Sequence, residues 1–329
     1  MTDPLAIPVS ATPQGWRWVA LDAVRGGALL AMAAYHATWD LGYLRLTPEN
    51  YALTPLGKVA AHLIAGTFLF LVGVGLVLMN RDGIRWRAFL IRLLRIGGAA
   101  VAITVATAVA FPDSYIFFGI LHCIALSSVL ALPFLFLPVG LVAVTSVLVL
   151  AAPHVIAADL LDASVLAFLG LGRGVPQTND YVPLFPWFGM VLAGMAVARF
   201  SARATAGAFP AGRRASGRGL RVLAFAGRHS LAVYLVHQPA LLALLTGLAT
   251  LTGPHPKAGE ADFRQTYRRN CMGTGGQAEP CRIAARCVVG ALRREGLWVE
   301  AGRSFTTAER QRAQALSQDC YEAADAPRP

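Results

Sequence analysis

The residues best suited to chemistry lie in one apolar stretch near the start of the chain, residues 19–39. Asp22 and Arg25 stand near its beginning, His36 stands near its end, and Asp40 follows directly. An ionisable group inside a membrane span costs about 3 kcal/mol, so it is normally paired and normally functional. Asp22 and Arg25 are three residues apart, and we expect them to form an ion pair on one helical face.

His36 is the leading candidate for a catalytic residue. An imidazole titrates near neutrality, so it can take a proton from the hydroxyl or amine of an acceptor. Asp40, one helical turn further on, would orient the ring and stabilise the imidazolium. Arg25 and His36 are eleven residues apart, which places them on one face at about 16 Å along the axis. This spacing predicts a site that reaches through the membrane.

The composition indicates the class of protein. Of 329 residues, 56% are hydrophobic and only 14% are charged, whereas soluble domains contain roughly 25% charged residues. The net charge of +11 is concentrated in a few loops and in the C-terminal region. That distribution is typical of membrane topology, so no nucleic acid is expected as a partner.

Seven apolar segments are expected to cross the bilayer, because a spanning helix needs roughly 20 residues. The predicted fold class is an all-α integral membrane protein with about seven transmembrane helices and a small disulfide-bearing periplasmic C-terminal tail. The predicted spans are residues 19–39, 57–79, 88–111, 116–136, 138–156, 182–200 and 229–251.

The arginines predict the orientation. Residues 80–87 form one strongly basic loop, and residues 199–228 form another with seven arginines and no acidic residue. An even number of predicted spans separates these loops, so both can be cytoplasmic, with the N-terminus inside and the tail outside. We therefore expect a cytoplasmic N-terminus (residues 1–18), a membrane domain (19–251) and a periplasmic tail (252–329). The richness in Ala, Gly and Arg is typical of a bacterial chain, so the expected location is the inner membrane.

The cysteines support this orientation. Cys123 is alone in a predicted span, where it is expected to pack as a small apolar residue. The other four lie in the tail with no histidine at zinc spacing, so we predict two disulfides in an oxidising compartment and no metal site. Four cysteines allow three pairings, which the sequence leaves open. These four residues are Cys271, Cys281, Cys287 and Cys320.

Other charged residues can complete a binding site at the cytoplasmic end. Arg92 and Arg95 begin the third span and, together with Arg25, can form a cationic patch for the phosphates of coenzyme A. They can equally extend to the lipid headgroups. Asp22 and Arg25 can equally form a purely structural pair.

Three further histidines and one tryptophan are secondary candidates. His62 is expected at a similar height to His36, and His122 begins the fourth span. His237 lies about 12 Å into the last span, close to a proline that frees backbone groups. Any of these can instead be a hydrogen-bonded packing residue. Trp39, beside His36, can hold a sugar ring.

Five segments, taken in order, resemble the bacterial branch of the heparan-alpha-glucosaminide N-acetyltransferase catalytic-domain family. The spacing of Arg25 and His36 also matches the arginine–histidine motif of the related acyltransferase-3 family. The resemblance covers about residues 15–250 and is carried by residues 21–41, 67–75, 118–126, 181–189 and 227–237.

This resemblance implies a transmembrane acyltransferase that uses cytoplasmic acyl-CoA as donor, with no permanently bound cofactor. The acceptor would be an amino sugar or glycan hydroxyl on the far side. Arg25 would contact the donor, and His36 would act as base or acyl relay. One departure is that the heparan family's proposed catalytic histidine precedes the second span, whereas residues 51–61 contain none and His62 only follows them.

Two other classes of function remain open at this point. The chain can be a transporter or channel whose proton or substrate path runs through Asp22, Arg25 and the membrane histidines. It can also be a membrane scaffold that presents the tail. An inverted repeat would favour transport, and the sequence shows none. The expected partners are the lipid bilayer, acyl-CoA and an envelope saccharide, and the sequence is compatible with a homo-oligomer.

Overall fold

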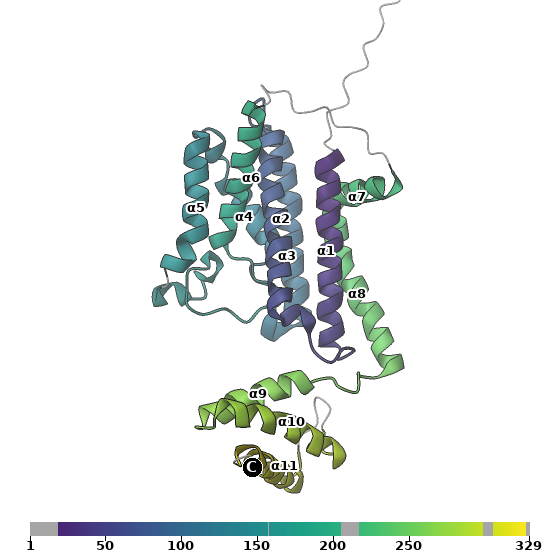
Figure 1. Cartoon of the computed structure of the whole chain (residues 1–329). Helices are drawn as coiled ribbons and strands as arrows, with labels where there is room; N and C mark the ends of the chain where they lie inside the picture. The colour runs from purple at the N-terminus through teal and green to yellow at the C-terminus, as the bar shows by residue number, and fades with distance from the viewer. Residues whose placement is uncertain (1–18, 157, 205–216, 299–304, 327–329) are drawn as a thin grey trace, which may run out of the picture. The chain divides into compact units, whose positions relative to one another are not determined.

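A computed structural model describes residues 19–156, 158–204, 217–298 and 305–326, and every regular element in these ranges is a helix (Figure 1). The predicted all-α membrane fold with a disulfide-bearing C-terminal region is confirmed. The long helices are α1 (Val19–Tyr43), α2 (Pro55–Met79), α3 (Trp86–Ala110), α4 (Ile120–Leu130), α5 (Val139–Val155), α6 (Leu184–Ala204), α7 (Arg218–Arg228), α8 (Ser230–Thr252), α9 (Glu260–Gly273), α10 (Ala278–Arg294) and α11 (Thr307–Asp325). Short 3-10 turns are η1 (Tyr51–Leu53), η2 (Pro112–Ser114), η3 (Pro133–Leu135), η4 (Asp159–Asp162) and η5 (Ala167–Leu169).

A helix occupies each of the seven predicted spans, but the helices differ in their capacity to cross a membrane. Within the described ranges, four are both long and apolar enough: α2, α3, α6 and α8. Helix α1 has 25 residues but carries three charged side chains. Helix α4 has only 11 residues, because irregular chain and a proline-initiated turn occupy the ends of its predicted segment. Helix α5 has 17 residues and fills nearly all of its predicted segment, which was itself short.

The chain divides into two compact units, and the boundary runs through α1. The first, called here the membrane body, contains the chain up to Ala34 and Val59–Pro239. The second, called here the tail unit, contains Tyr35–Lys58 and the chain from Ala240 onward. The C-terminal end of α1 therefore belongs with the cysteine-bearing region.

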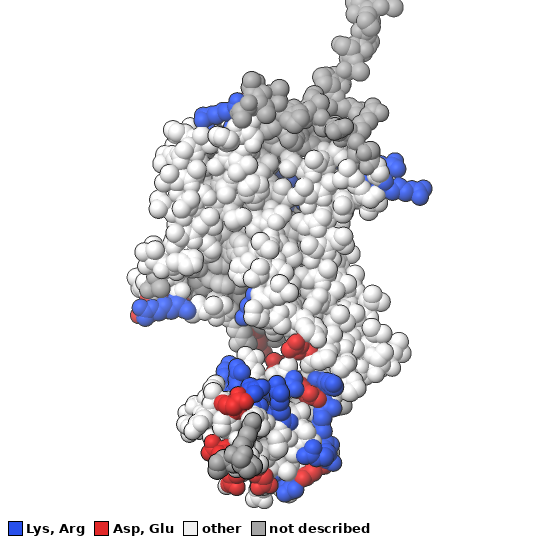
Figure 2. Space-filling model, in the orientation of Figure 1, with Lys and Arg blue, Asp and Glu red and all other residues white. Residues whose placement is uncertain are grey.

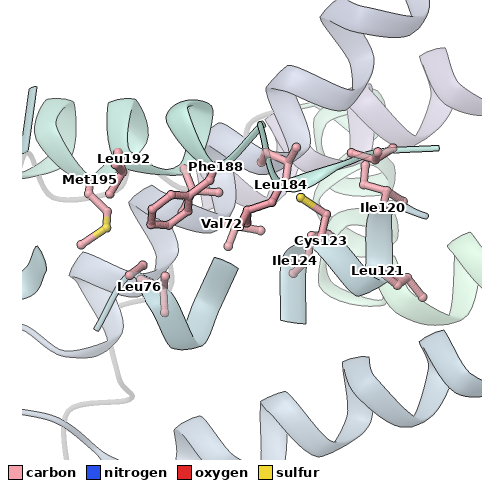
Figure 3. Close-up of a cluster of buried hydrophobic side chains, with 14 of the residues drawn as sticks. Val72, Leu76, Ile120, Leu121, Cys123, Ile124, Leu184, Phe188, Leu192 and Met195 are labelled. Carbon is pink, nitrogen blue, oxygen red and sulfur yellow. The ribbon is translucent and has the colours of Figure 1, made fainter. Parts of the chain in front are cut away.

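The core of the membrane body consists of apolar side chains from α2, α3, α4, α5 and α6. Figure 3 labels those of α2, α4 and α6. Leu76 and Leu192 are fully buried in this core, and Cys123 is buried there without a disulfide, as predicted. In a bilayer such contacts stabilise the fold by close packing rather than by removing apolar surface from water.

Helices α2 and α6 touch through glycines. A Cβ atom on Gly73 would lie 1.9 Å from the carbonyl oxygen of Val191, and one on Gly194 would lie 2.0 Å from that of Phe70. Small residues at such crossings allow backbones to approach closely. Gly75, two residues after Gly73, has nothing within 4 Å of an added Cβ.

The tail unit contains a three-helix bundle held by two disulfides. Cys271–Cys281 joins the end of α9 to the start of α10, and Cys287–Cys320 joins α10 to α11. Val288, Leu292 and Leu316 form its small apolar core. Figure 2 shows charged side chains of both signs on the surface of this bundle, whereas the visible face of the membrane body is almost uncharged. The bundle thus has the surface of a water-exposed module.

Candidate functional site

The first turns of α1 contain the predicted ion pair. Arg25 Nη1 lies 3.3 Å from Asp22 Oδ1, and the two side chains are 29% and 17% exposed. Their separation of three residues places both on one helical face. The pair is therefore half-buried, and its guanidinium remains partly accessible.

Helix α7 packs against this turn of α1, and this contact has no counterpart in our sequence interpretation. Figure 1 shows α7 lying crosswise to α1. A Cβ atom on Gly227 would lie 1.8 Å from the carbonyl oxygen of Asp22, and one on Gly26 would lie 2.0 Å from that of Leu223. The two backbones touch on either side of Arg25, so α7 fixes the position of the ion pair. The sequence carried a signal for this, because apolar or small residues recur at helical spacing between the arginines.

Of the two other candidate arginines, one lies near Arg25. Arg92 on α3 is half-buried and experiences the positive charge of Arg25. Arg95, one turn further along α3, is exposed. Arg25 and Arg92 together carry two positive charges against the one negative charge of Asp22. Such an arrangement suits a ligand with several phosphate oxygens.

The C-terminal end of α1 carries the second set of candidates. His36 is half-buried, and Asp40, four residues later, is fully buried. Residues four apart on a helix are neighbours on one face. Trp39 stacks on Tyr43 with ring centroids 4.9 Å apart, so its ring is held parallel to a second aromatic surface.

The loop after α1 is fixed to the same end of the helix. Asn50 Nδ2 donates to the carbonyl oxygen of Trp39 at 3.3 Å, and Asn50 Oδ1 accepts from the backbone N–H of Ala52 at 3.2 Å. The Tyr35 hydroxyl donates to the carbonyl oxygen of Ala52 at 3.4 Å. These bonds restrain the turn that carries His36. We did not select Asn50 or Tyr35 from the sequence, because their partners become neighbours only in the fold.

His122 is held by hydrogen bonds to both ring nitrogens. Thr104 Oγ1 donates its proton to the carbonyl oxygen of Ile116, so His122 Nε2, 3.1 Å away, is the donor to that hydroxyl. The backbone N–H of Gly119 donates to His122 Nδ1 at 3.3 Å. The network assigns the neutral tautomer with the proton on Nε2. This geometry anchors the chain before α4 and leaves no ring nitrogen for an acceptor.

A mostly apolar cavity of about 580 Å³ lies beside His122, between α3, α4 and η5. Its lining residues include Val101, Phe118, Leu126 and Phe168. None of the candidate arginines lines it. The cavity therefore suits an apolar group and not a phosphate.

Asp180 provides a further polar anchor, which the sequence analysis did not single out. Its Oδ2 accepts from the backbone N–H of Ile120, the first residue of α4, at 3.0 Å. Burial raises the pKa of this carboxyl above 3.8, and the hydrogen bond from Ile120 partly opposes that shift. Tyr234 on α8 lies within range of its charge. The partner is 60 residues away in the chain, so no local pattern could reveal this cap.

The two remaining candidate histidines occupy different settings. His62 on α2 is exposed, with its ring centroid 5.5 Å from that of Trp187 on α6. His237 on α8 is half-buried, and its Nδ1 lies 2.6 Å from the carbonyl oxygen of Tyr234. Both lie in the membrane body.

Comparison with known families decides the assignment. The family described as heparan-alpha-glucosaminide N-acetyltransferase, catalytic, matches residues 17–239. The chain belongs to this family. The match covers more than half of the chain and contains both ends of α1, together with His62, His122 and His237. The resemblance inferred from the five motifs is thus confirmed.

Membership in the heparan-alpha-glucosaminide N-acetyltransferase catalytic family, with the apolar helices, indicates a multi-pass membrane acetyltransferase. The matched range ends before α9, so the disulfide-bearing bundle lies outside the family's catalytic region. No curated protein and no solved structure matches the chain.

Proposed function

We propose that this protein transfers an acetyl or other acyl group from cytoplasmic acyl-CoA to an amino sugar or glycan hydroxyl on the periplasmic side of a bacterial inner membrane. The observation that carries the proposal is the distribution of polar groups on α1, inside the matched family region. The Asp22–Arg25 pair stands at one end and His36 with Asp40 at the other, about 16 Å apart along the axis.

The donor would bind at the Asp22–Arg25 end. Acyl-CoA presents phosphate groups to Arg25 and Arg92, whose combined charge exceeds that of Asp22. Charge-assisted hydrogen bonds to phosphate are stronger than neutral ones, and guanidinium groups match phosphate geometry. Acyl-CoA is a donor substrate in this scheme and not a resident cofactor. Arg95, which is exposed, would contribute to long-range attraction only.

The acceptor would bind at the His36 end. His36 takes a proton from the acceptor amine or hydroxyl as its nitrogen or oxygen attacks the thioester carbonyl. The carbon–sulfur bond then breaks, the acyl group remains on the acceptor, and the imidazolium returns the proton to the coenzyme A thiolate. Asp40 stabilises the imidazolium, and Trp39 offers an aromatic face to a sugar ring.

The test separates donor binding from chemistry. In the purified full chain, Arg25→Ala should weaken acetyl-CoA binding at least tenfold, because it removes a charged phosphate partner. Arg95→Ala is the matched control and should change binding less than twofold. Binding is measured by isothermal titration calorimetry. No binding of near-millimolar acetyl-CoA by the unaltered protein would return the chain to the transporter or scaffold classes.

A second variant tests the chemistry. His36→Ala should abolish acyl transfer to added amino sugars while leaving acetyl-CoA binding unchanged. His62→Ala serves as the comparison at a histidine on the neighbouring helix in sequence. Undiminished transfer by His36→Ala would move the proton-transfer role to His62, because both ring nitrogens of His122 are already hydrogen-bonded.

The proposed orientation has its own test. Reporter fusions after Gly83 should report the cytoplasm, and fusions after Asp325 should report the periplasm. A cytoplasmic signal from the second fusion would place the acceptor side of the scheme in the wrong compartment.

A further inference from the structure

Helix α7 presents an outward face that neither the family match nor the proposed reaction explains. The side chains of Val222 and Phe225 are 66% and 59% exposed. Arg218, Arg221 and Arg228 are exposed on the same short helix, which carries no acidic residue. These five residues are called here the outer face of α7.

The opposite face of α7 is fully occupied. Ala224 and Gly227 are buried, and the backbone contact with Asp22 described above presses that face onto α1. The helix therefore cannot rotate to hide Val222 and Phe225 against the protein. Val222 and Phe225 are exposed among arginines, so a partner that covers this face must offer both an apolar and an anionic surface.

The place of α7 in the chain identifies that partner. Only His229 separates it from α8, which is long and apolar enough to cross a membrane. It also packs on the first turns of α1 and lies crosswise to that helix (Figure 1). A helix that runs crosswise at the start of a membrane helix lies at the boundary between lipid and water. Surface helices that carry basic side chains together with Phe or Leu lie in this plane.

We propose that the outer face of α7 is a binding surface for anionic phospholipid. Arg218, Arg221 and Arg228 bind the headgroup phosphates, while Val222 and Phe225 insert among the upper acyl carbons. A soluble nucleotide phosphate would account for the arginines but not for two exposed apolar side chains between them. The lipid surface accounts for both. This binding is independent of the proposed acyl transfer.

The proposal is tested by lipid binding itself. The full chain in detergent is titrated with phosphatidylglycerol or phosphatidylcholine, and bound lipid is counted by native mass spectrometry. The variant Arg218→Gln/Arg221→Gln/Arg228→Gln should lose at least tenfold in affinity for phosphatidylglycerol, since a basic side chain at an anionic surface contributes about fivefold. Arg264→Gln/Arg268→Gln/Arg269→Gln on α9 removes the same charge from exposed positions and should change the affinity less than twofold.

A third variant tests the apolar part. Phe225→Ser keeps every charge and should weaken the binding of both lipids, whereas a pure phosphate site would not respond. Equal phosphatidylglycerol retention by the α7 variant and the unaltered protein would overturn the proposal. The proposal would also be overturned if the α9 variant lost as much affinity for phosphatidylglycerol as the α7 variant. If the α7 variant loses acetyl-CoA binding but retains phosphatidylglycerol, the surface is a nucleotide site and the lipid proposal fails. Because no readout measures acyl transfer, failure of the proposed reaction leaves this test intact.

Discussion

The membrane body and the tail unit are both helical, yet they are held together by different means. In the membrane body, glycines bring backbones into contact, as at the crossing of Gly73 with Val191. In the tail unit, two disulfides and exposed ion pairs join helices around a small apolar core. The bilayer removes the hydrophobic force between helices, so shape complementarity must replace it. In a small water-exposed bundle the hydrophobic force is present, but the core buries too little apolar surface to hold the helices together. Disulfides supply the missing stability.

The largest expected effect comes from the glycine crossing. Gly73→Ala places a carbon 1.9 Å from a backbone oxygen that cannot move alone, so we expect a loss of more than about 3 kcal/mol or no folded protein. Gly75→Ala is the control on the same helix, where the added carbon meets nothing within 4 Å. Monodisperse yield and thermal unfolding measure both. Similar behaviour of the two variants would remove shape complementarity as the feature that distinguishes the body.

The disulfides should affect only the tail unit. Their loops span 10 and 33 residues, so the chain-entropy relation gives about 2.7 and about 3.7 kcal/mol. Cys287→Ser/Cys320→Ser should therefore destabilise the bundle more than Cys271→Ser/Cys281→Ser. Limited proteolysis in increasing urea reports the bundle, and α2–α6 should keep their resistance in both variants. Cleavage within those helices would show that the two regions are not independently held.

A smaller effect concerns Asp180 in the membrane body. Its folded-state pKa lies above 3.8 because of burial, so the folded state binds the proton more tightly than the unfolded state. The resulting stability is present at low pH and is lost as the pH rises through the raised pKa. Asp180→Asn keeps an oxygen for the N–H of Ile120 and should flatten this dependence. The midpoint of thermal unfolding is measured for Asp180→Asn and for the unaltered protein from pH 3.8 upward. Identical dependence on pH in the two proteins would contradict the prediction.

The smallest effect is expected at the surface of the tail unit. Two hydrogen bonds from Arg312, at 2.8 and 2.6 Å, hold the pKa of Glu295 below 4.5. Stability from this pair is present above pH 4.5 and is lost as the pH falls through the lowered pKa. Because both groups are exposed and screened, Arg312→Gln should restore the pKa of Glu295 without a measurable change in stability at neutral pH. Carboxyl NMR titration of the labelled chain detects the shift, and an unchanged pKa would contradict it.

The sequence predicted the elements of the membrane body better than their contacts. Apolar runs located a helix at every predicted span, but the length of α4 depends on extended chain before Ile120 that no periodicity marks. Helix α7 was concealed because seven arginines in residues 199–228 made the segment resemble a solvated loop. The packing role of its inner face, with Ala224 and Gly227, is evident only in the fold, where the backbone of Asp22 lies against Gly227.

In the candidate site, too, contacts within one helix were predictable and contacts between distant residues were not. The Asp22–Arg25 pair was predictable because a spacing of three residues fixes it within one helix. The settings of His122 and Asp180 were not, because their partners Thr104 and Ile120 lie 18 and 60 residues away. The sequence predicted two disulfides but left their pairing open, because the pairing depends on contacts between distant residues. Cys287 meets Cys320 only through the packing of α10 on α11.

The unequal lengths of the lipid-facing helices have a consequence for the host membrane. Helix α3 has 25 residues and rises about 38 Å, whereas α5 has 17 and rises about 26 Å. Leu148 and Val155 on α5 are exposed for contact with acyl chains. Lipids beside α5 must compress or those beside α3 must stretch, and such hydrophobic mismatch costs a fraction of a kcal/mol per Å. We therefore expect the bilayer to be locally thinner beside α5 than beside α3.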